Sequence, residues 1–247
     1  MKAMILAAGL GTRLRPLTDA RPKALVEING RTLLEITLAR LRTFGVSEVV
    51  INVHHFADMI VEYLRARDNF GMSIVVSREE VLLDTGGGLK KAAHFLVDSA
   101  RPEEPFIVHN VDVLSTIDLR HMVQFHKENQ ALATLAVQDR ETSRYLLFDE
   151  QRQLCGRRTR RDQPELVRSC QQAQALAFSG IHVISPHLLG MMVEELAFSV
   201  ITSYLRLAAQ GEKIVAFRTD QYYWRDLGTL ENVAQASQDL KQKVFAQ

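Results

Sequence analysis

The sequence opens with residues 1–23, MKAMILAAGLGTRLRPLTDARPK, and this stretch decides the fold. Residues 4–6 form a short apolar run that is typical of a buried strand. Residues 7–13, AAGLGTR, follow with little side-chain bulk before Arg13, so backbone N–H groups can approach an anion closely. Arg13 and Lys23 add positive charge, and two prolines stiffen the path between them. We therefore predict a polyphosphate-binding loop at the end of a strand.

This loop matches neither of two common phosphate-binding motifs. A Walker A loop ends in Gly-Lys-Ser/Thr, which is missing here, and a GxGxxG fingerprint requires glycine where this chain has Leu14. Taken alone, Gly9 and Gly11 are equally compatible with a tight strand-to-turn packing role. The phosphate interpretation therefore depends on the cations and prolines that follow the glycines.

The first 112 residues alternate between strand and helix patterns. The spacing of apolar residues predicts helices at 32–44 and 57–66. A third helix is predicted at 89–97, directly after a triple glycine. Apolar runs predict strands at 48–53, 71–76 and 106–108. This alternation predicts a mainly parallel sheet with helices on both faces. Ligands of such sheets bind at the carboxyl ends of the strands.

The second half of the chain is less regular. Strands are predicted at 131–137, 145–148, 175–184 and 214–217, and helices at 118–127, 187–195, 199–208 and from Leu230 onward. Residues 152–168 form a basic, polar stretch between two of these strands. Because no internal repeat or low-complexity linker divides the chain, we predict a single domain with an inserted subdomain.

The composition argues against several classes of protein. Hydrophobic residues make up 47% and charged residues 24%, which is ordinary for a globular enzyme. A net charge of +1 argues against nucleic acid as a partner, and no apolar run is long enough to span a bilayer, so we expect no membrane partner. The two cysteines, Cys155 and Cys170, suggest neither a metal pair nor a disulfide framework. We therefore expect a cytoplasmic protein.

Two aspartates follow strand-like segments in distant parts of the chain. Asp112 comes after the strand at 106–108, and Asp226 lies in the segment WRDLGT before the last helix. Mg²⁺ prefers one or two carboxylates together with phosphate oxygens and water. Asp112 could instead be a turn residue, and Asp226 could cap the helix that follows.

A second glycine-rich segment, LDTGGG, covers residues 83–88 and precedes a predicted helix. It could contact a ligand through its backbone. It could equally be an ordinary helix start in which Asp84 or Thr85 supplies the cap.

Residues 9–23 resemble the signature of the sugar-1-phosphate nucleotidyltransferases (NDP-sugar pyrophosphorylases), whose pattern is GxGTRxxPxTxxxPK. Every fixed position is met: Gly9, Gly11, Thr12, Arg13, Pro16, Thr18, Pro22 and Lys23. The DTGGG and FSGI segments look most like N-acetylmuramate-1-phosphate uridylyltransferases and mannose-1-phosphate guanylyltransferase-like proteins. The resemblance implies a three-layer, Rossmann-like α/β fold with a mainly parallel mixed sheet and a small inserted sugar-binding subdomain. It divides the single domain 1–247 into a nucleotide-binding half, 1–112, and a half, 113–247, that carries the sugar site and the second metal ligand.

The resemblance also implies an activity of the EC 2.7.7 type. An NTP and a sugar 1-phosphate would give an NDP-sugar and pyrophosphate by Mg²⁺-assisted in-line attack on the α-phosphate. The implied catalytic residues are Arg13, Lys23 and Asp112, and the implied metal ligands are Asp112 and Asp226. The implied nucleotide-binding residues are Ala7, Ala8, Gly9, Gly11, Thr12, Arg13, Lys23, Asp84, Thr85 and Gly86. The implied sugar-binding residues are Asn110, Gly87, Ser179 and Gly180.

This sequence departs from the family pattern at two points. Val111 stands where the family usually has glycine before the first metal-binding aspartate, and a side chain there could crowd the substrate. The Glu-Lys pair that holds the sugar phosphate in many relatives is missing. Arginines within residues 157–161 could replace it, because guanidinium groups bind phosphate well, or they could belong to a solvated basic loop.

Two other functions remain open. A cytidylyltransferase for phosphocholine or a similar alcohol phosphate would use the same loop, but it would need an aromatic or acidic cage for the quaternary ammonium. A regulatory homologue would keep the binding pocket and lack turnover. We expect a monomer or a small homo-oligomer whose partners are an NTP and a sugar 1-phosphate.

Overall fold

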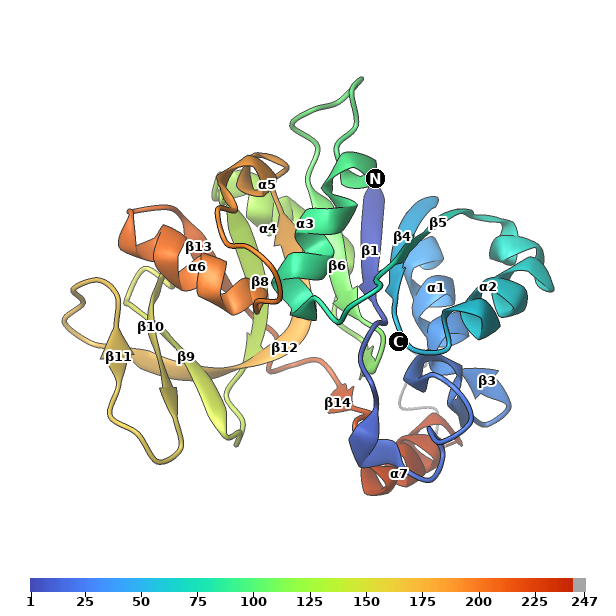
Figure 1. Ribbon diagram of the computed structural model, residues 1–247. Helices are drawn as coiled ribbons and strands as arrows, with labels where there is room; N and C mark the ends of the chain where they lie inside the picture. The colour runs from blue at the N-terminus through green and yellow to red at the C-terminus, as the bar shows by residue number, and fades with distance from the viewer. Residues whose placement is uncertain (242–247) are drawn as a thin grey trace.

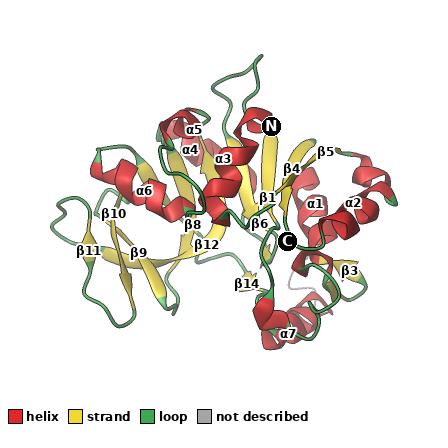
Figure 2. Cartoon of the chain, viewed as in Figure 1, coloured by secondary structure: helices red, strands yellow, loops and turns green. Residues whose placement is uncertain are grey.

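The computed structural model describes residues 1–241, which form a central mixed sheet with helices on both faces (Figures 1 and 2). The strands of the main sheet run in the order β5 (Ser73–Arg78), β4 (Glu48–Val53), β1 (Lys2–Leu6), β6 (Phe106–Asn110), β12 (Gln174–Ile184), β8 (Ala133–Gln138) and β13 (Ile214–Arg218). The first four are mutually parallel, and β12 is antiparallel to both of its neighbours. The predicted α/β fold with a mainly parallel mixed sheet is confirmed.

The helices complete a three-layer arrangement. The described helices are α1 (Leu33–Thr43), α2 (Ala57–Arg65), α3 (Asp84–Leu96), α4 (Leu119–Glu128), α5 (His187–Met191), α6 (Val200–Ala209) and α7 (Leu230–Lys241). Short 3-10 turns are η1 (Thr12–Leu14), η2 (Lys23–Leu25) and η3 (Asp68–Gly71). No helix among residues 1–241 is long and apolar enough to cross a membrane.

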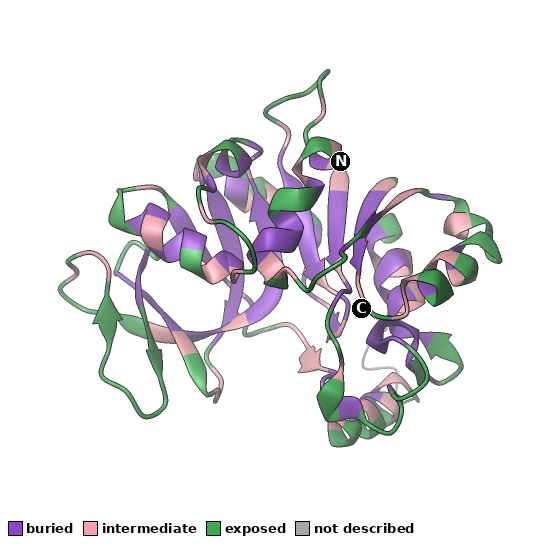
Figure 3. Ribbon diagram, in the orientation of Figure 1, coloured by how far each residue is buried: buried purple, intermediate pink, exposed green. Residues whose placement is uncertain are grey.

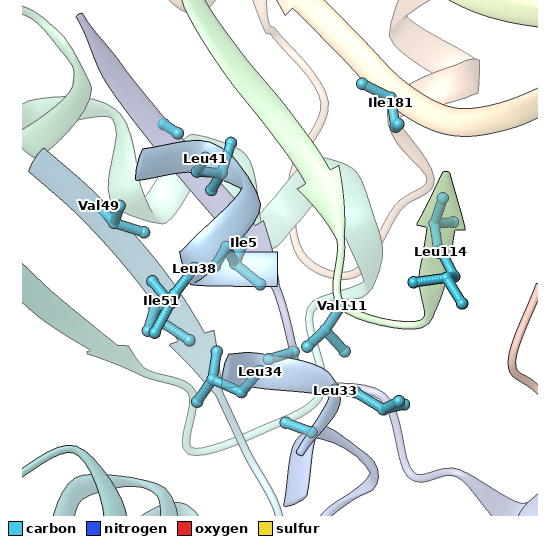
Figure 4. Close-up of a cluster of buried hydrophobic side chains, with 14 of the residues drawn as sticks. Ile5, Leu33, Leu34, Leu38, Leu41, Val49, Ile51, Val111, Leu114 and Ile181 are labelled. Atoms are coloured by element: carbon cyan, nitrogen blue, oxygen red, sulfur yellow. The ribbon is translucent and has the colours of Figure 1, made fainter. Parts of the chain in front are cut away.

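Alternate side chains of β1 enter two separate cores. Ile5 is completely buried with residues of α1, α2 and α4, whereas Met4 is completely buried on the other face with residues of α3 and α6. Figure 4 shows Ile5 with side chains of α1 and β4 and with Val111, which follows β6. Full burial of a side chain of this size contributes about 2–3 kcal/mol, and a sheet covered on both faces explains why its strands are almost continuously apolar.

An antiparallel extension projects from the main sheet at the amino-terminal end of β12 (Figure 1). It consists of β9 (Arg144–Phe148), β10 (Leu154–Thr159) and β11 (Glu165–Leu166). The basic stretch 152–168, which showed no strand pattern, therefore contains two strands. Only the first residues of β10 are buried, and the rest of β10 and β11 is exposed (Figure 3), so their polar sequence lacks the alternation that marks a half-buried strand.

Two further short ladders were not predicted. Strands β2 (Glu27–Ile28) and β3 (Arg31–Thr32) pair ahead of α1, and β7 (Val113–Ser115) pairs with β14 (Trp224–Asp226). The β7–β14 ladder joins segments that are more than a hundred residues apart in the chain, and it pairs Asp226 with Val113, the residue that follows Asp112. Helix α3 also begins earlier than predicted, at Asp84, so the triple glycine lies inside the helix.

Candidate active site

The loop after β1 is held in a fixed shape by contacts with its own later residues. Gly11 has a φ of 65°, in the left-handed region that favours glycine, and its carbonyl accepts a 2.9 Å hydrogen bond from the Thr18 hydroxyl. A Cβ at Gly11 would lie 3.0 Å from Thr18 and 3.1 Å from Lys23. Gly11 and Thr18 of the signature are therefore required for the loop conformation that returns Lys23 to the end of β1.

A buried polar pair anchors the start of this loop. The Asn52 side-chain oxygen, at the end of β4, accepts a 2.8 Å hydrogen bond from the Ala7 N–H. The Asn52 amide donates to Glu79 at 2.7 Å, and the other Glu79 oxygen accepts from the Leu83 N–H at 3.0 Å. Asn52 and Glu79 are 2% and 5% exposed, so the network links the phosphate loop to the glycine-rich segment inside the protein. Sequence analysis missed both residues, although a polar Asn52 inside an apolar strand was a usable signal.

Lys23 and Asp112 form an ion pair at the ends of the parallel strands. The Lys23 ammonium donates to the Asp112 carboxylate, and the two side chains are only 11% and 16% exposed. Pairing of this kind is needed because an isolated charge with so little access to water would be strongly destabilising.

Asp112 and Asp226 lie on neighbouring segments. Asp226 pairs with Val113 in the β7–β14 ladder, and the Asp112 carbonyl accepts a 2.7 Å hydrogen bond from the Leu227 N–H. The Asp226 carboxylate accepts from Gly228 N–H at 2.8 Å, whereas Thr229 accepts from Asn232 N–H at the start of α7. Thr229, rather than Asp226, thus caps the last helix, while Asp112 is paired with Lys23 and Asp226 accepts from Gly228 N–H.

The donor set of these aspartates suits Mg²⁺. Two carboxylates beside a phosphate-binding loop are what this hard cation takes from a protein, the other ligands being phosphate oxygens and water. Residues 1–241 contain no cluster of three or more histidine, cysteine, aspartate or glutamate side chains able to hold a metal. Asp112 and Asp226 alone would therefore supply the carboxylates.

Gly228 separates Asp226 from Arg13. A Cβ at this position would lie 2.6 Å from the Arg13 guanidinium and 2.6 Å from the Asp226 carboxylate. Only a residue without a side chain allows the cation of the first loop to lie this close to the last strand. Gly228 belongs to the site for this reason and was not singled out in the sequence.

The triple glycine allows α3 to pack closely against two other segments. A Cβ at Gly86 would lie 2.3 Å from the Phe198 ring, one at Gly87 would lie 2.6 Å from the Leu196 carbonyl, and one at Gly88 would lie 2.6 Å from Glu79. The Gly86 N–H donates to the Phe198 carbonyl at 2.8 Å. The Thr85 hydroxyl accepts from the Val200 N–H, so it tethers α6 instead of capping α3.

Two cavities adjoin at Asn110. The smaller, about 440 Å³, is lined by Leu6, Ala7, Ala8, Gly9, Lys23, Asn52, Leu82, Asp84, Thr85, Asn110, Val111, Asp112 and Ala197. The larger, about 1050 Å³, is lined mainly by residues of the antiparallel extension, together with Arg13, Asn110, Ser179, Gly180 and Asp226. Most of the predicted nucleotide-binding residues thus line the smaller cavity, and most of the predicted sugar-binding residues line the larger one. Gly11, Thr12, Gly86 and Gly87 line neither.

The larger cavity is strongly charged. Its lining includes five arginines and three carboxylates: Arg13, Arg140, Arg144, Arg157, Arg158, Asp162, Glu165 and Asp226. Of the arginines at 157–161, only Arg157 and Arg158 line it. Arg157 pairs with Glu165 at 2.7 Å, and the two side chains are 50% and 57% exposed. Arg140, which the sequence analysis did not consider, is the more enclosed cation.

Val111 does not crowd the larger cavity. Its side chain is 3% exposed and belongs to the core beneath the site, and its N–H donates to the Leu6 carbonyl at 3.1 Å (Figure 4). The neighbouring His109 is completely buried and lines neither cavity. Burial lowers the pKa of His109 to about 4, so its imidazole is neutral at neutral pH.

The first loop, Asp112 and Asp226 lie together at the carboxyl ends of the parallel strands, which is where α/β proteins bind their ligands. The family model described as Nucleotidyl transferase matches residues 2–243, and the chain belongs to this family. The resemblance to sugar-1-phosphate nucleotidyltransferases is thereby confirmed.

Relatives and solved structures agree with this assignment. Over 113 residues, 44% of this chain, it is 50% identical to the N-acetylmuramate alpha-1-phosphate uridylyltransferase of Caulobacter vibrioides. Over 92% of this chain it is 28% identical to the mannose-1-phosphate guanyltransferase of Candida albicans. The chain spans 45% and 61% of the length of these two relatives. Its fold is similar to that of a UDP-glucose pyrophosphorylase complexed with UDP-glucose, with a TM-score of 0.79, 19% identity and 98% of each chain covered.

Proposed function

We propose that this chain joins an NTP to a sugar 1-phosphate, releasing pyrophosphate and forming an NDP-sugar. The observation that carries this proposal is the pair of adjoining cavities, which share Asn110. The smaller contains Lys23 and Asp112, and the larger contains Arg13 and Asp226, so cations and carboxylates from both loops surround the boundary between them.

In the proposed reaction, a sugar-phosphate oxygen forms a bond to the α-phosphorus of the NTP. The bond from that phosphorus to the bridging oxygen of pyrophosphate breaks at the same time, so no enzyme nucleophile is required. The protein's task is to hold two anions together and to stabilise their combined charge. Mg²⁺, when held by Asp112 and Asp226, would neutralise part of this charge and polarise the α-phosphate.

Other residues of the chain would stabilise charge on the phosphates and bind the sugar. Lys23, which lines the smaller cavity and is paired with Asp112, would stabilise negative charge developing on the α-phosphate. Arg13 and the backbone of the first loop would hold the departing phosphates. Asn110, Ser179 and Gly180 would bind the sugar, since all three line the larger cavity.

The larger cavity disfavours phosphocholine as a substrate. A quaternary ammonium needs an open aromatic face or an acidic cage. Here the only tryptophan of the chain, Trp224, is already covered by the Arg140 guanidinium at 3.7 Å, and arginines outnumber carboxylates in the lining. The retained ion pair of Lys23 and Asp112 likewise supports an enzyme more than a regulatory homologue.

The test is pyrophosphate release with Mg²⁺ across four NTPs and the 1-phosphates of N-acetylmuramate, N-acetylglucosamine, mannose and glucose. We expect release that requires one NTP, one class of sugar 1-phosphate and Mg²⁺, and that stops when EDTA is added. Phosphocholine serves as the comparison acceptor. No release from folded protein that still binds an NTP would overturn the proposal, as would release with phosphocholine alone.

A further inference from the structure

Arg140 follows β8 and reaches the inner part of the larger cavity. Its guanidinium carbon lies 3.7 Å from the centroid of the Trp224 ring, and one terminal nitrogen donates to the Phe178 carbonyl at 2.9 Å. The Trp224 ring nitrogen in turn donates to the Ser179 carbonyl at 2.8 Å. The guanidinium plane is therefore fixed by stacking on one side and by a hydrogen bond at one end.

Three buried polar atoms in this cavity have no hydrogen-bond partner among residues 1–241. They are the Arg140 Nε, the Asn110 side-chain oxygen and the Ser179 hydroxyl. Buried polar groups in folded proteins are almost always hydrogen-bonded, because leaving one unpaired costs free energy. All three residues line the larger cavity, so its wall contains polar groups whose hydrogen-bonding capacity the described residues do not use.

The charge around Arg140 is incompletely balanced. It forms no ion pair with any carboxylate of residues 1–241, and burial lowers its pKa, an effect that nearby Asp226 partly opposes. Trp224 and Asp226 are two residues apart on β14, so their side chains share one face of that strand. Arg140, stacked on Trp224, thus lies near Asp226, the proposed metal ligand, and has N–H groups without a hydrogen-bond acceptor among residues 1–241.

We propose that Arg140, stacked on Trp224, binds the phosphate of the sugar 1-phosphate. This inference rests on the proposed function and assigns the role that the missing Glu-Lys pair leaves open. A guanidinium can donate two parallel hydrogen bonds to a phosphate, and the two terminal nitrogens of Arg140 can supply them because only one of their N–H groups is used within residues 1–241, by the Phe178 carbonyl. Arg157 and Arg158 are more exposed, and Arg157 is already paired with Glu165.

The first test compares Arg140→Gln and Arg140→Lys with the wild type in steady-state kinetics. We expect Arg140→Gln to raise the KM for the sugar 1-phosphate about 30-fold and to change the KM for the NTP less than twofold. Arg140→Lys keeps the charge and loses the fork, so its KM should lie in between. Arg160→Gln is the matched control, because Arg160 is exposed, pairs with Glu141 and lies outside both cavities. Equal increases in both KM values would indicate a structural role and overturn the assignment.

The second test does not require turnover. Trp224 is the only tryptophan of the chain, so its fluorescence reports directly on the stacked pair. We expect glucose 1-phosphate, mannose 1-phosphate or an N-acetylhexosamine 1-phosphate to change this fluorescence, with about 30-fold weaker binding to Arg140→Gln. Binding that depends on Arg140 would support the assignment even if the pyrophosphate assay were silent. No binding of any sugar 1-phosphate, or equal binding to wild type and variant, would overturn it.

Discussion

The two cavities of this protein are built in different ways. The smaller lies at the ends of parallel strands. Three alanines and a glycine are among its lining residues, and the buried pair of Asn52 and Glu79 supports it. The larger is lined by long charged and aromatic side chains from β9, β10, β12, β14 and the loops between them. Closely packed small residues tolerate few larger replacements, whereas a cavity lined by long side chains can change its ligand by single substitutions.

This contrast separates what the two cavities would contribute. The triphosphate is common to all NTPs, and a rigid array of N–H groups can bind it without contacting the base. Sugars differ in the positions of their polar groups, so discrimination between them needs side chains. The proposed catalytic and metal-binding groups are divided between the two cavities, with Lys23 and Asp112 in the lining of the smaller one and Arg13 and Asp226 in that of the larger one.

The largest expected effect is on kcat and comes from substitution of Asp112. Asp112→Asn should reduce kcat for pyrophosphate release about a thousandfold, because it removes a carboxylate that we propose as a metal ligand and leaves the enclosed Lys23 ammonium without a counter-charge. Asp68→Asn is the matched control, since Asp68 is exposed on η3 and its φ of 47° suits asparagine. A decrease of less than tenfold in folded Asp112→Asn protein would contradict the assigned role.

The next effect tests the rigid framework of the smaller cavity. Gly86→Ala should lower the free energy of unfolding by about 3 kcal/mol, because the new Cβ would meet the Phe198 ring at 2.3 Å. Gly190→Ala in α5 meets nothing within 4 Å and should be neutral or slightly stabilising. Urea unfolding measures both variants. Equal stability of Gly86→Ala and the wild type would mean that the close packing of α3 is not required.

The same contrast explains what could be predicted from the sequence. The first loop is a local motif, and the apolar segments of the first half are long enough to show their period, so the parallel sheet and most of the smaller cavity follow from residue order. Helix α3 was the exception, because a triple glycine disfavours a helix unless close packing demands it, and Phe198 lies far away in the chain.

The larger cavity could not be derived in this way. Strand β14 has three residues, too few to show a pattern, yet it positions Asp226 and Trp224. Strands β10 and β11 are mostly exposed, so their sequence resembles that of a polar loop. The contact of Arg140 with Trp224 joins two segments whose proximity depends on the whole sheet order. Trp224 begins the WRDLGT segment, but no motif marks Arg140 as its partner. Asp112 and Asp226 were predicted together only because the family resemblance linked them.

The smallest effect is a response to acid in the second half of the chain, which contains two of the three buried histidines, His126 and His182. The buried histidines His109, His126 and His182 lie on β6, α4 and β12, whereas the histidines before residue 106 are at least partly exposed. His126 forms hydrogen bonds with Thr134 and Ser185 at 2.9 and 3.0 Å, and burial, with a smaller effect of Lys127, lowers its pKa to about 4. Because the unfolded chain binds this proton more readily, stability is present above pH 6.5 and is lost as the pH falls toward 4.

His126 alone should therefore account for about 2 kcal/mol of lost unfolding free energy between pH 7 and pH 5. His126→Gln keeps polar contacts with its neighbours and cannot titrate, so it should be less stable than the wild type at pH 7 but lose about 2 kcal/mol less by pH 5. His121→Gln is the control, because His121 is exposed on the same helix. The pH dependence of its unfolding free energy should match that of the wild type. Urea unfolding at both pH values measures these differences. Parallel pH profiles for His126→Gln and the wild type would show that the buried imidazole is not what makes this half of the sheet sensitive to acid.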